Sequence, residues 1–190
     1  DAIVMFSHDW GIPYGRALTA HLGEFLQEHD LTILELALDK FHYEKISELL
    51  KRHDQDTSLV HEVVRLEIDS INIVTLMRIC GLELKESSAE DYFVPGGSIA
   101  TAQDFARIME LGQPEDVYEV LLNRTPYRKT LEKAWANFDE RGENAFQDEL
   151  EKHMISACLK MSKDPLGIGV IINYMWRKYL EITNLRIIIR

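Results

Sequence analysis

Histidine and aspartate side chains that stand next to each other could bind a metal ion in this chain. Such pairs occur at His8-Asp9, His29-Asp30 and His53-Asp54. Imidazole nitrogens and carboxylate oxygens are ligands of divalent metals, and a metal-bound water can attack a phosphate ester. One hypothesis is therefore an all-helical, metal-dependent phosphohydrolase with the candidate ligands His21, His29, Asp30 and Asp69. The alternative is that the pairs lie at solvated helix ends, where each aspartate caps the next helix.

Other catalytic patterns are incomplete in this sequence. The stretch His61 to Val64 is followed by Arg65, so the second histidine of the zinc-protease motif is missing. No Walker sequence, GxGxxG or GxSxG motif occurs. The stretch Gly167 to Gly169 follows no predicted strand, so its small residues favour close helix approach over phosphate binding. We therefore expect a non-catalytic protein that uses no cofactor and no metal.

A polar pattern that occurs twice is the most informative feature of the chain. The pattern reads R-x3-[DE]-x2-N-x5-R, and its two copies are offset by 112 residues. The first copy is Arg65, Asp69, Asn72 and Arg78, and the second is Arg177, Glu181, Asn184 and Arg190. Upstream, the segments 38–40 and 150–152 match at the same offset, and Pro13-Tyr14 matches Pro126-Tyr127 at an offset of 113. The pattern recurs in side-chain chemistry, which hydrophobic periodicity alone would not reproduce.

Helical spacing places the first copy of this pattern on one ridge. Arg65 and Asp69 are i,i+4 neighbours, and Asn72 lies three residues further on. If the ridge is buried, the guanidinium and the carboxylate must satisfy each other, and Asn72 must bond a neighbouring helix. The pattern is then a repeated clamp between helices, and the alternative is a contact to a partner. If buried, Asp69→Ala should cost about 1–3 kcal/mol, because it strands Arg65.

Hydrophobic residues repeat at helical spacing along most of the chain. In residues 31–53 they form one apolar stripe, and a capping box begins at Thr32. Residues 57–79 carry a wider stripe, which predicts a helix buried on most sides, with Asp56 or Thr57 as its N-cap. We expect about eight to ten helices joined in short antiparallel hairpins.

Prolines and glycines predict where further helices and turns begin. Pro114, Pro126 and Pro165 are each expected at a first helical position. The segment Val94-Pro95-Gly96-Gly97 predicts a turn in which at least one glycine takes a positive φ. The final run Ile187–Ile189 continues a helical pattern that starts at Tyr174, so it is expected to be helix and not strand.

Composition and charge exclude several classes of partner. The chain has 190 residues, 46% of them hydrophobic, which suits an ordinary globular protein. Its net charge of -11 disfavours nucleic acids and anionic lipid surfaces, and suits a partner with a basic face. Cys80 and Cys158 lie far apart and form no CxxC pair, so neither a disulfide framework nor a zinc knuckle is indicated.

Five segments of the chain resemble the C subunit of the archaeal and bacterial A/V-type rotary ATPases, whose eukaryotic relative is the d subunit of the V-type ATPase. They read LELALDKFHY (34–43), EIDSINIVTLMR (67–78), VPGG (94–97), PLGIG (165–169) and EITNLRIIIR (181–190). The resemblance runs through most of the chain, and the last segment is the most specific. It implies a protein with no catalytic residues.

The resemblance also implies an architecture and a mechanical role. Members of this family have three similar helical domains arranged as a funnel, and this chain is similar to about two of them. The first domain and a short tail after Arg190 are therefore expected to be absent. The family protein sits on the cytoplasmic mouth of the membrane-embedded proteolipid ring and receives the central stalk in its cavity. It couples ATP hydrolysis or synthesis to proton or sodium transport.

We therefore predict an all-α protein of tandem repeated helical bundles that form part of a funnel. The expected units are residues 1–81 and residues 82–190. The expected function is that of a rotor subunit, peripheral on the cytoplasmic side of a membrane complex. Its partners would be the proteolipid ring and the central stalk, with no nucleic acid and no small-molecule substrate. The alternative is a generic helical scaffold or adaptor, and behind it the phosphohydrolase.

Overall fold

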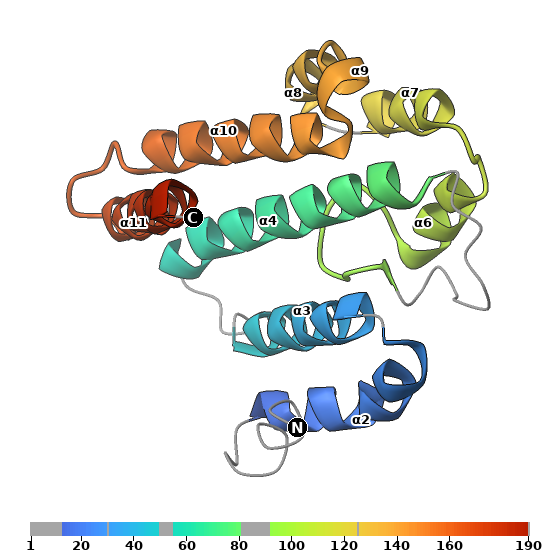
Figure 1. Cartoon of the computed structure of the whole chain (residues 1–190). Helices are drawn as coiled ribbons and strands as arrows, with labels where there is room; N and C mark the ends of the chain where they lie inside the picture. Colours follow the sequence, from blue (N-terminus) through green and yellow to red (C-terminus); the bar gives the residue numbers. More distant parts are fainter. Residues whose placement is uncertain (1–12, 30, 50–54, 81–91, 125, 190) are drawn as a thin grey trace.

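A computed structural model describes residues 13–29, 31–49, 55–80, 92–124 and 126–189 (Figure 1). These ranges contain nine helices and no strand, in agreement with the predicted all-α class. In chain order they are α2 (Pro13–Glu28), α3 (Leu31–Leu49), α4 (Gln55–Ile79), α6 (Ala102–Met109), α7 (Pro114–Arg124), α8 (Arg128–Trp135), α9 (Phe138–Arg141), α10 (Glu143–Met161) and α11 (Gly169–Ile189).

Most predicted helices are confirmed, but several of their predicted first residues are wrong. Pro114 begins α7 as expected, whereas Pro126 and Pro165 lie in turns before α8 and α11. Thr32 lies inside α3 and does not cap it, because the helix already begins at Leu31. Asp56 and Thr57 likewise lie inside α4. Hydrophobic periodicity locates a helix body well, whereas the exact start depends on which backbone groups find partners.

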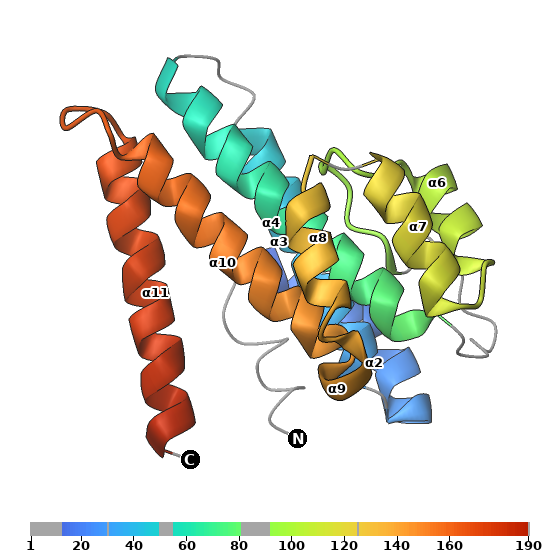
Figure 2. The same ribbon diagram turned by 90° about the horizontal axis from the view of Figure 1, so that it is seen from above.

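The long helix α4 lies at the centre of the molecule (Figure 1). It runs antiparallel to α10, and α3 lies on its other side with α2 packed beyond α3. The short helices α6 and α7 cover the C-terminal half of α4 (Figure 2). Helix α11 packs mainly on α10 and extends away from the rest of the bundle. The prediction that residues 57–79 form a helix buried on most sides is therefore confirmed.

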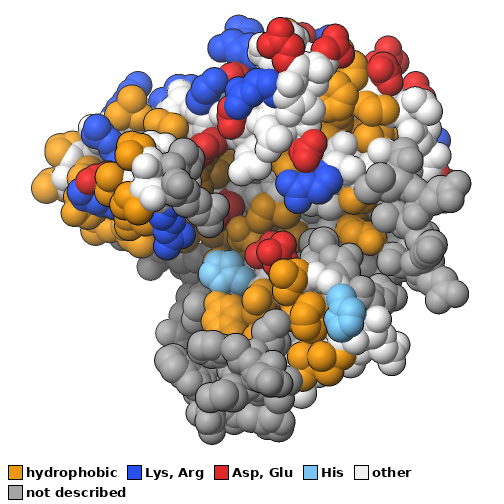
Figure 3. Space-filling view, in the orientation of Figure 1, with side chains coloured by type: hydrophobic (Ala, Val, Ile, Leu, Met, Phe, Trp, Pro, Cys, Tyr) orange, Lys and Arg blue, Asp and Glu red, His pale blue; other side chains and the backbone are white. Residues whose placement is uncertain are grey.

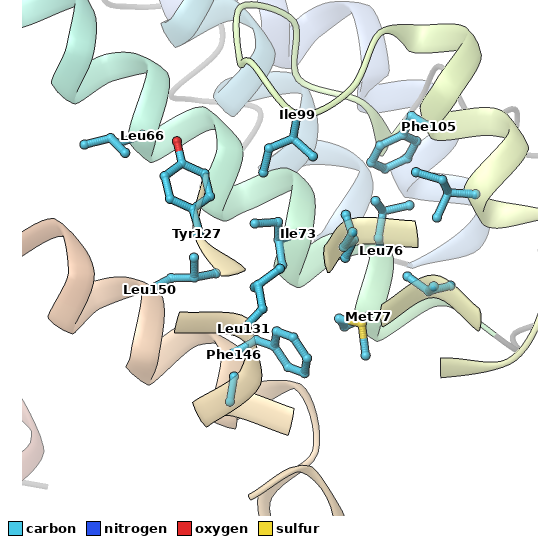
Figure 4. Close-up of a cluster of buried hydrophobic side chains, with 14 of the residues drawn as sticks. Leu66, Ile73, Leu76, Met77, Ile99, Phe105, Tyr127, Leu131, Phe146 and Leu150 are labelled. Carbon is cyan, nitrogen blue, oxygen red and sulfur yellow. The ribbon is translucent and has the colours of Figure 1, made fainter. Parts of the chain in front are cut away.

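The main hydrophobic core forms between α4, α6, α7, α8 and α10 (Figure 4). Its fully buried side chains include Ile73 and Leu76 from α4, Phe105 from α6 and Phe146 from α10. Burying a side chain of this size contributes about 1.5–3 kcal/mol, so these contacts hold the helices in place. A smaller cluster of Tyr43, Ile68 and Val94 joins α3 to the other side of α4.

Helix bounds follow the offset of the sequence repeat. Helices α3 and α10 have 19 residues each, and both of their ends differ by 112 in residue number. At the same offset, α4 corresponds to α11 and α2 corresponds to α8. The packing agrees with this, since α2 packs on α3 and α8 packs on α10. The division into units 1–81 and 82–190 stays a prediction, because its boundary falls in residues outside the described ranges.

Candidate functional site: a buried carboxylate and an acidic cavity

Asp69 is a buried carboxylate on the central helix α4, with 1% of its surface exposed. Its Oδ1 accepts hydrogen bonds from the backbone N–H groups of Ser98, at 2.6 Å, and Ile99, at 3.1 Å. Its Oδ2 accepts from the hydroxyls of Ser98, at 2.6 Å, and Tyr127, at 2.8 Å. Burial and this bond to a carboxylate raise the pKa of the Tyr127 phenol. Within the described structure, these four donors compensate the charge of the carboxylate.

The loop of residues 93–101, which contains Ser98 and Ile99, is also held against α4 at Val94, by the side chain of Asn72. Its side-chain NH₂ donates to the carbonyl of Val94, at 2.9 Å, and its Oδ1 accepts from the Val94 N–H, at 3.0 Å. Between these two anchors the chain makes the predicted turn, in which Gly96 has a φ of 111°. The Cα of Gly97 lies so close to α4 that an added Cβ would collide with the Asp69 carboxylate. Asp69 and Asn72 together therefore clamp the turn onto α4.

The partners of this clamp differ from those that the sequence predicts. Arg65 is exposed and is not one of the groups bonded to Asp69, and Asn72 bonds a loop, not a helix. The carboxylate takes its partners from Ser98 and Ile99, after the turn, and from Tyr127. Arg78 is also exposed, and its Nε lies 3.7 Å from Oε1 of Glu143. Val94 lies in the predicted VPGG turn, and Tyr127 lies in the Pro-Tyr pair that the sequence repeats. These two features could have identified both residues as partners of the clamp.

The second copy of the pattern lies on α11 and is exposed. Arg177, Glu181 and Asn184 are all exposed, and Glu181 accepts a hydrogen bond from Lys178, at 2.7 Å. Arg190 lies outside the described residues. Within the described structure, the two copies thus share positions on equivalent helices but not their surroundings.

A cavity of about 380 Å³ opens between α3, α4, α10 and α11. Four carboxylates line it, from Glu35, Asp39, Glu67 and Glu151, together with the guanidinium of Arg78. The rest of its lining is mainly aromatic and aliphatic, with Tyr92, Trp176 and Tyr179 among these residues. Figure 3 shows acidic side chains in the hollow between α3 and the layer of α4, α10 and α11. The cavity combines apolar walls with an excess of negative charge, a surface suited to an amphipathic cation.

Burial dominates the electrostatics of this cavity. It raises the pKa values of the Glu67 and Asp39 carboxyls. A hydrogen bond with Tyr43 opposes the shift at Glu67, and His42 opposes it at Asp39. Burial also raises the pKa of Glu151, with a smaller contribution from Asp148. The ionised forms are therefore incompletely compensated within the described structure, and a cation brought by a partner would stabilise them.

The residues proposed as metal ligands do not form a site in the described structure. Asp69 is occupied by the turn, whereas His21 and His29 are exposed on and just after α2. Figure 1 shows α3 between α2 and α4, and Asp30 lies outside the described residues. Across the described ranges, no three His, Cys, Asp or Glu side chains gather closely enough to hold a metal ion.

Comparison with known proteins gives a consistent result. The profile of the family described as the ATP synthase (C/AC39) subunit matches residues 3–190. The chain is 26% identical over 193 residues to the C subunit of the A-type ATP synthase of Methanosphaera stadtmanae, covering 95% of this chain and 47% of that protein. It is 29% identical over 182 residues to the C subunit of the V-type ATP synthase of Thermus thermophilus, covering 95% and 50%.

These relatives are longer than the chain, which spans about half of their length. The C subunit is a structural and not a catalytic component of the A/V-type ATP synthase. No helix in the described ranges has the length and apolar character to cross a bilayer. Because the family profile covers nearly the whole sequence, the chain belongs to the ATP synthase (C/AC39) subunit family.

Proposed function

We propose that this chain acts as a rotor component that links the central stalk of a rotary ATPase to its proteolipid ring. It would couple ATP hydrolysis or synthesis to proton or sodium transport without catalysing either step. Its place would be the cytoplasmic side of the membrane, with the ring as its only link to the bilayer. The observation that carries this proposal is the match of the family profile to residues 3–190.

A rigid helical framework supports a role in torque transmission. Helix α4 has 25 residues, which corresponds to about 37 Å at 1.5 Å per residue. The core holds this helix on one side, and the clamp of Asp69 and Asn72 fixes the following turn to it. A fully bonded buried polar network adds geometric specificity to apolar packing. Such a helix resists the local rearrangement that would otherwise absorb a torque.

The acidic cavity is the candidate surface for the central stalk. Its four carboxylates and aromatic walls would receive a basic, partly apolar segment of the stalk. Opposite charges would steer that encounter and fix its register. Carboxylates kept partly buried at a cost in stability are more easily explained by a partner than by folding alone.

Affinity purification of the full-length protein from detergent-solubilised membranes tests this function. We expect the proteolipid ring and the central-stalk proteins to co-purify. Asp39→Asn combined with Glu151→Gln should weaken stalk binding about tenfold at low salt and flatten its salt dependence. Ring binding should be unaffected by this change if the cavity serves the stalk.

The matched control neutralises two exposed carboxylates outside the cavity, Glu119→Gln with Asp139→Asn. It changes the net charge equally, so it should leave the salt dependence close to that of the wild type. A protein that purifies with neither ring nor stalk would instead support the generic scaffold. Equal losses in both double variants would show that overall charge, and not the cavity, guides the stalk.

A further inference from the structure

Helix α11 carries hydrophobic side chains on two opposite sides. On its inner side, Ile172 and Trp176 pack against the main core, and the helix contacts chiefly α10 (Figure 2). The outer side carries a row of six exposed residues, here called the outer seam, which are Ile171, Met175, Lys178, Ile182, Leu185 and Ile189. Its five hydrophobic members are between 49% and 81% exposed. A hydrophobic patch of this extent on a surface marks a site of interaction.

The spacing of the outer seam is that of a coiled coil. Its members follow one another at steps of four, three, four, three and four residues from Ile171 to Ile189. Such alternating steps keep one face of a helix turned toward a single long helix that runs beside it. At 1.5 Å per residue the seam is about 27 Å long, which is most of the length of the 21-residue α11. The geometry therefore fits a helix as the occupant.

The charge of α11 is opposite in sign to that of the whole chain. The helix has three basic residues, Arg177, Lys178 and Arg186, and one acidic residue, Glu181, whereas the chain has a net charge of -11. Lys178 lies in the middle of the outer seam, and its Nζ is 2.7 Å from Oε2 of Glu181 in a pair that is exposed to solvent. Figure 3 shows basic side chains among the hydrophobic ones over α11. A carboxylate on the occupant would complement this surface.

The same charges disfavour two other occupants of the outer seam. A second copy of the chain would bring an α11 with the same excess of basic residues, and a parallel pairing would place one Lys178 opposite the other. An anionic bilayer is an extended surface, so it would meet the negative charge of the whole molecule. A single helix meets mainly the local charge of α11, because more distant charges are screened beyond about 10 Å. An acidic helix avoids both conflicts.

We propose that the outer seam of α11 is a docking surface for one long, acidic amphipathic helix of another protein. Aliphatic side chains of that helix interdigitate with the seam, and one of its carboxylates pairs with Lys178 in place of Glu181. A charged residue in the middle of a hydrophobic seam fixes the register of the two helices, which gives Lys178 a role in choosing the partner. This inference goes beyond the proposed function, because it does not depend on what the acidic cavity binds.

Synthetic peptides test this surface on the whole chain. Two fluorescein-labelled helical peptides of about three heptads carry leucine along their seam and differ in one central seam residue, which is glutamate or lysine. Fluorescence anisotropy measures their binding at peptide concentrations where they are monomeric. We expect the glutamate peptide to bind about tenfold more tightly than the lysine peptide at low salt. Equal affinities, or no binding of either peptide, would overturn the proposal.

Variants of the chain show whether the outer seam carries this preference. Lys178→Glu should reverse it, so that the lysine peptide binds more tightly. Ile182→Asp should weaken the binding of both peptides about tenfold or more, because it places a charge among the aliphatic side chains. The matched control, Leu166→Asp, changes a residue that is 97% exposed in the turn before α11, and it should leave both affinities unchanged. A preference for the glutamate peptide that persists in Lys178→Glu would contradict the proposed docking.

The two other occupants have readouts of their own. We expect the chain to sediment as a monomer and not to float with vesicles of phosphatidylcholine and phosphatidylserine. A dimer that Ile182→Asp separates would show that the seam binds a second copy, and the proposed occupant would be wrong. Flotation that Ile182→Asp abolishes would assign the seam to a bilayer and overturn the proposal equally. Neither result bears on the binding of the stalk, which the variants of the acidic cavity test separately.

Discussion

Helices α4 and α11 carry equivalent residues, yet one is the most enclosed helix of the described structure and the other is among the most exposed. On α4, Asp69 and Asn72 are 1% and 2% exposed and bond a turn that comes later in the chain. On α11, Glu181 and Asn184 are exposed, and Glu181 pairs with Lys178 of its own helix. The repeated sequence thus places the same kinds of side chain on both helices. Whether these side chains stabilise the fold depends on whether another segment of the chain packs over them.

The largest expected contrast between the two helices is at the carboxylate. Asp69→Ala should lower the free energy of unfolding by about 4 kcal/mol, because it removes the acceptor of four hydrogen bonds, two of them to the buried Ile99 N–H and Tyr127 hydroxyl. This exceeds the expectation from the sequence, since the lost hydrogen bonds involve the turn and Tyr127 and not exposed Arg65. Glu181→Ala should change stability by less than about 0.5 kcal/mol. Urea unfolding followed by circular dichroism measures both, and equal losses would contradict the comparison.

The aliphatic positions should show a somewhat smaller contrast. Leu76→Ala should cost about 3 kcal/mol, because the side chain is fully buried in a packed core and its loss leaves a cavity. Ile188→Ala should cost less than about 0.5 kcal/mol, since that side chain is mostly exposed. The same urea titrations decide the matter. A large loss from Ile188→Ala would show that α11 is already covered in solution, for example by self-association.

The close approach of the turn to α4 gives a third test. Gly97→Ala should destabilise the protein by about 2 kcal/mol, because the new methyl group collides with the Asp69 carboxylate and displaces the turn. Gly23→Ala, in α2, meets open space and should stabilise the protein by about 0.5–1 kcal/mol. Thermal unfolding of the two variants gives the sign of each change. An unchanged stability of Gly97→Ala would show that the close contact between the turn and α4 is not needed for stability.

The smallest expected effect is at the cavity, where Glu67 of α4 corresponds to Tyr179 of α11. Burial raises the pKa of the Glu67 carboxyl, so the folded protein favours its protonated form. The contribution of this group to stability is therefore present below its ordinary pKa and is lost as the pH rises through its folded value. Glu67→Gln should raise the unfolding midpoint at about pH 7 and change it little at about pH 4. A gain that does not depend on pH would show that burial of the charge is not the cause.

The sequence predicts most of the described fold and part of the candidate site. Periodicity places the bodies of α3, α4 and α11, and the glycine pair places the turn at Gly96. The sequence also distinguishes Asp69 and Asn72, because a carboxylate and an amide occur again at the equivalent positions, Glu181 and Asn184. The acidic cavity was not predicted, since its carboxylates come from three helices whose packing no local pattern specifies.

Two kinds of information are thus separated in this chain. The sequence by itself determined the helical class, the repeat and the family, because each depends on residue types at fixed spacings along the chain. The tertiary structure alone decided that Asp69 bonds Ser98 and Tyr127, which lie 29 and 58 residues away, and not Arg65 on the same helix. A buried carboxylate must accept hydrogen bonds from donors that tertiary packing places beside it, whereas an exposed guanidinium can remain hydrated.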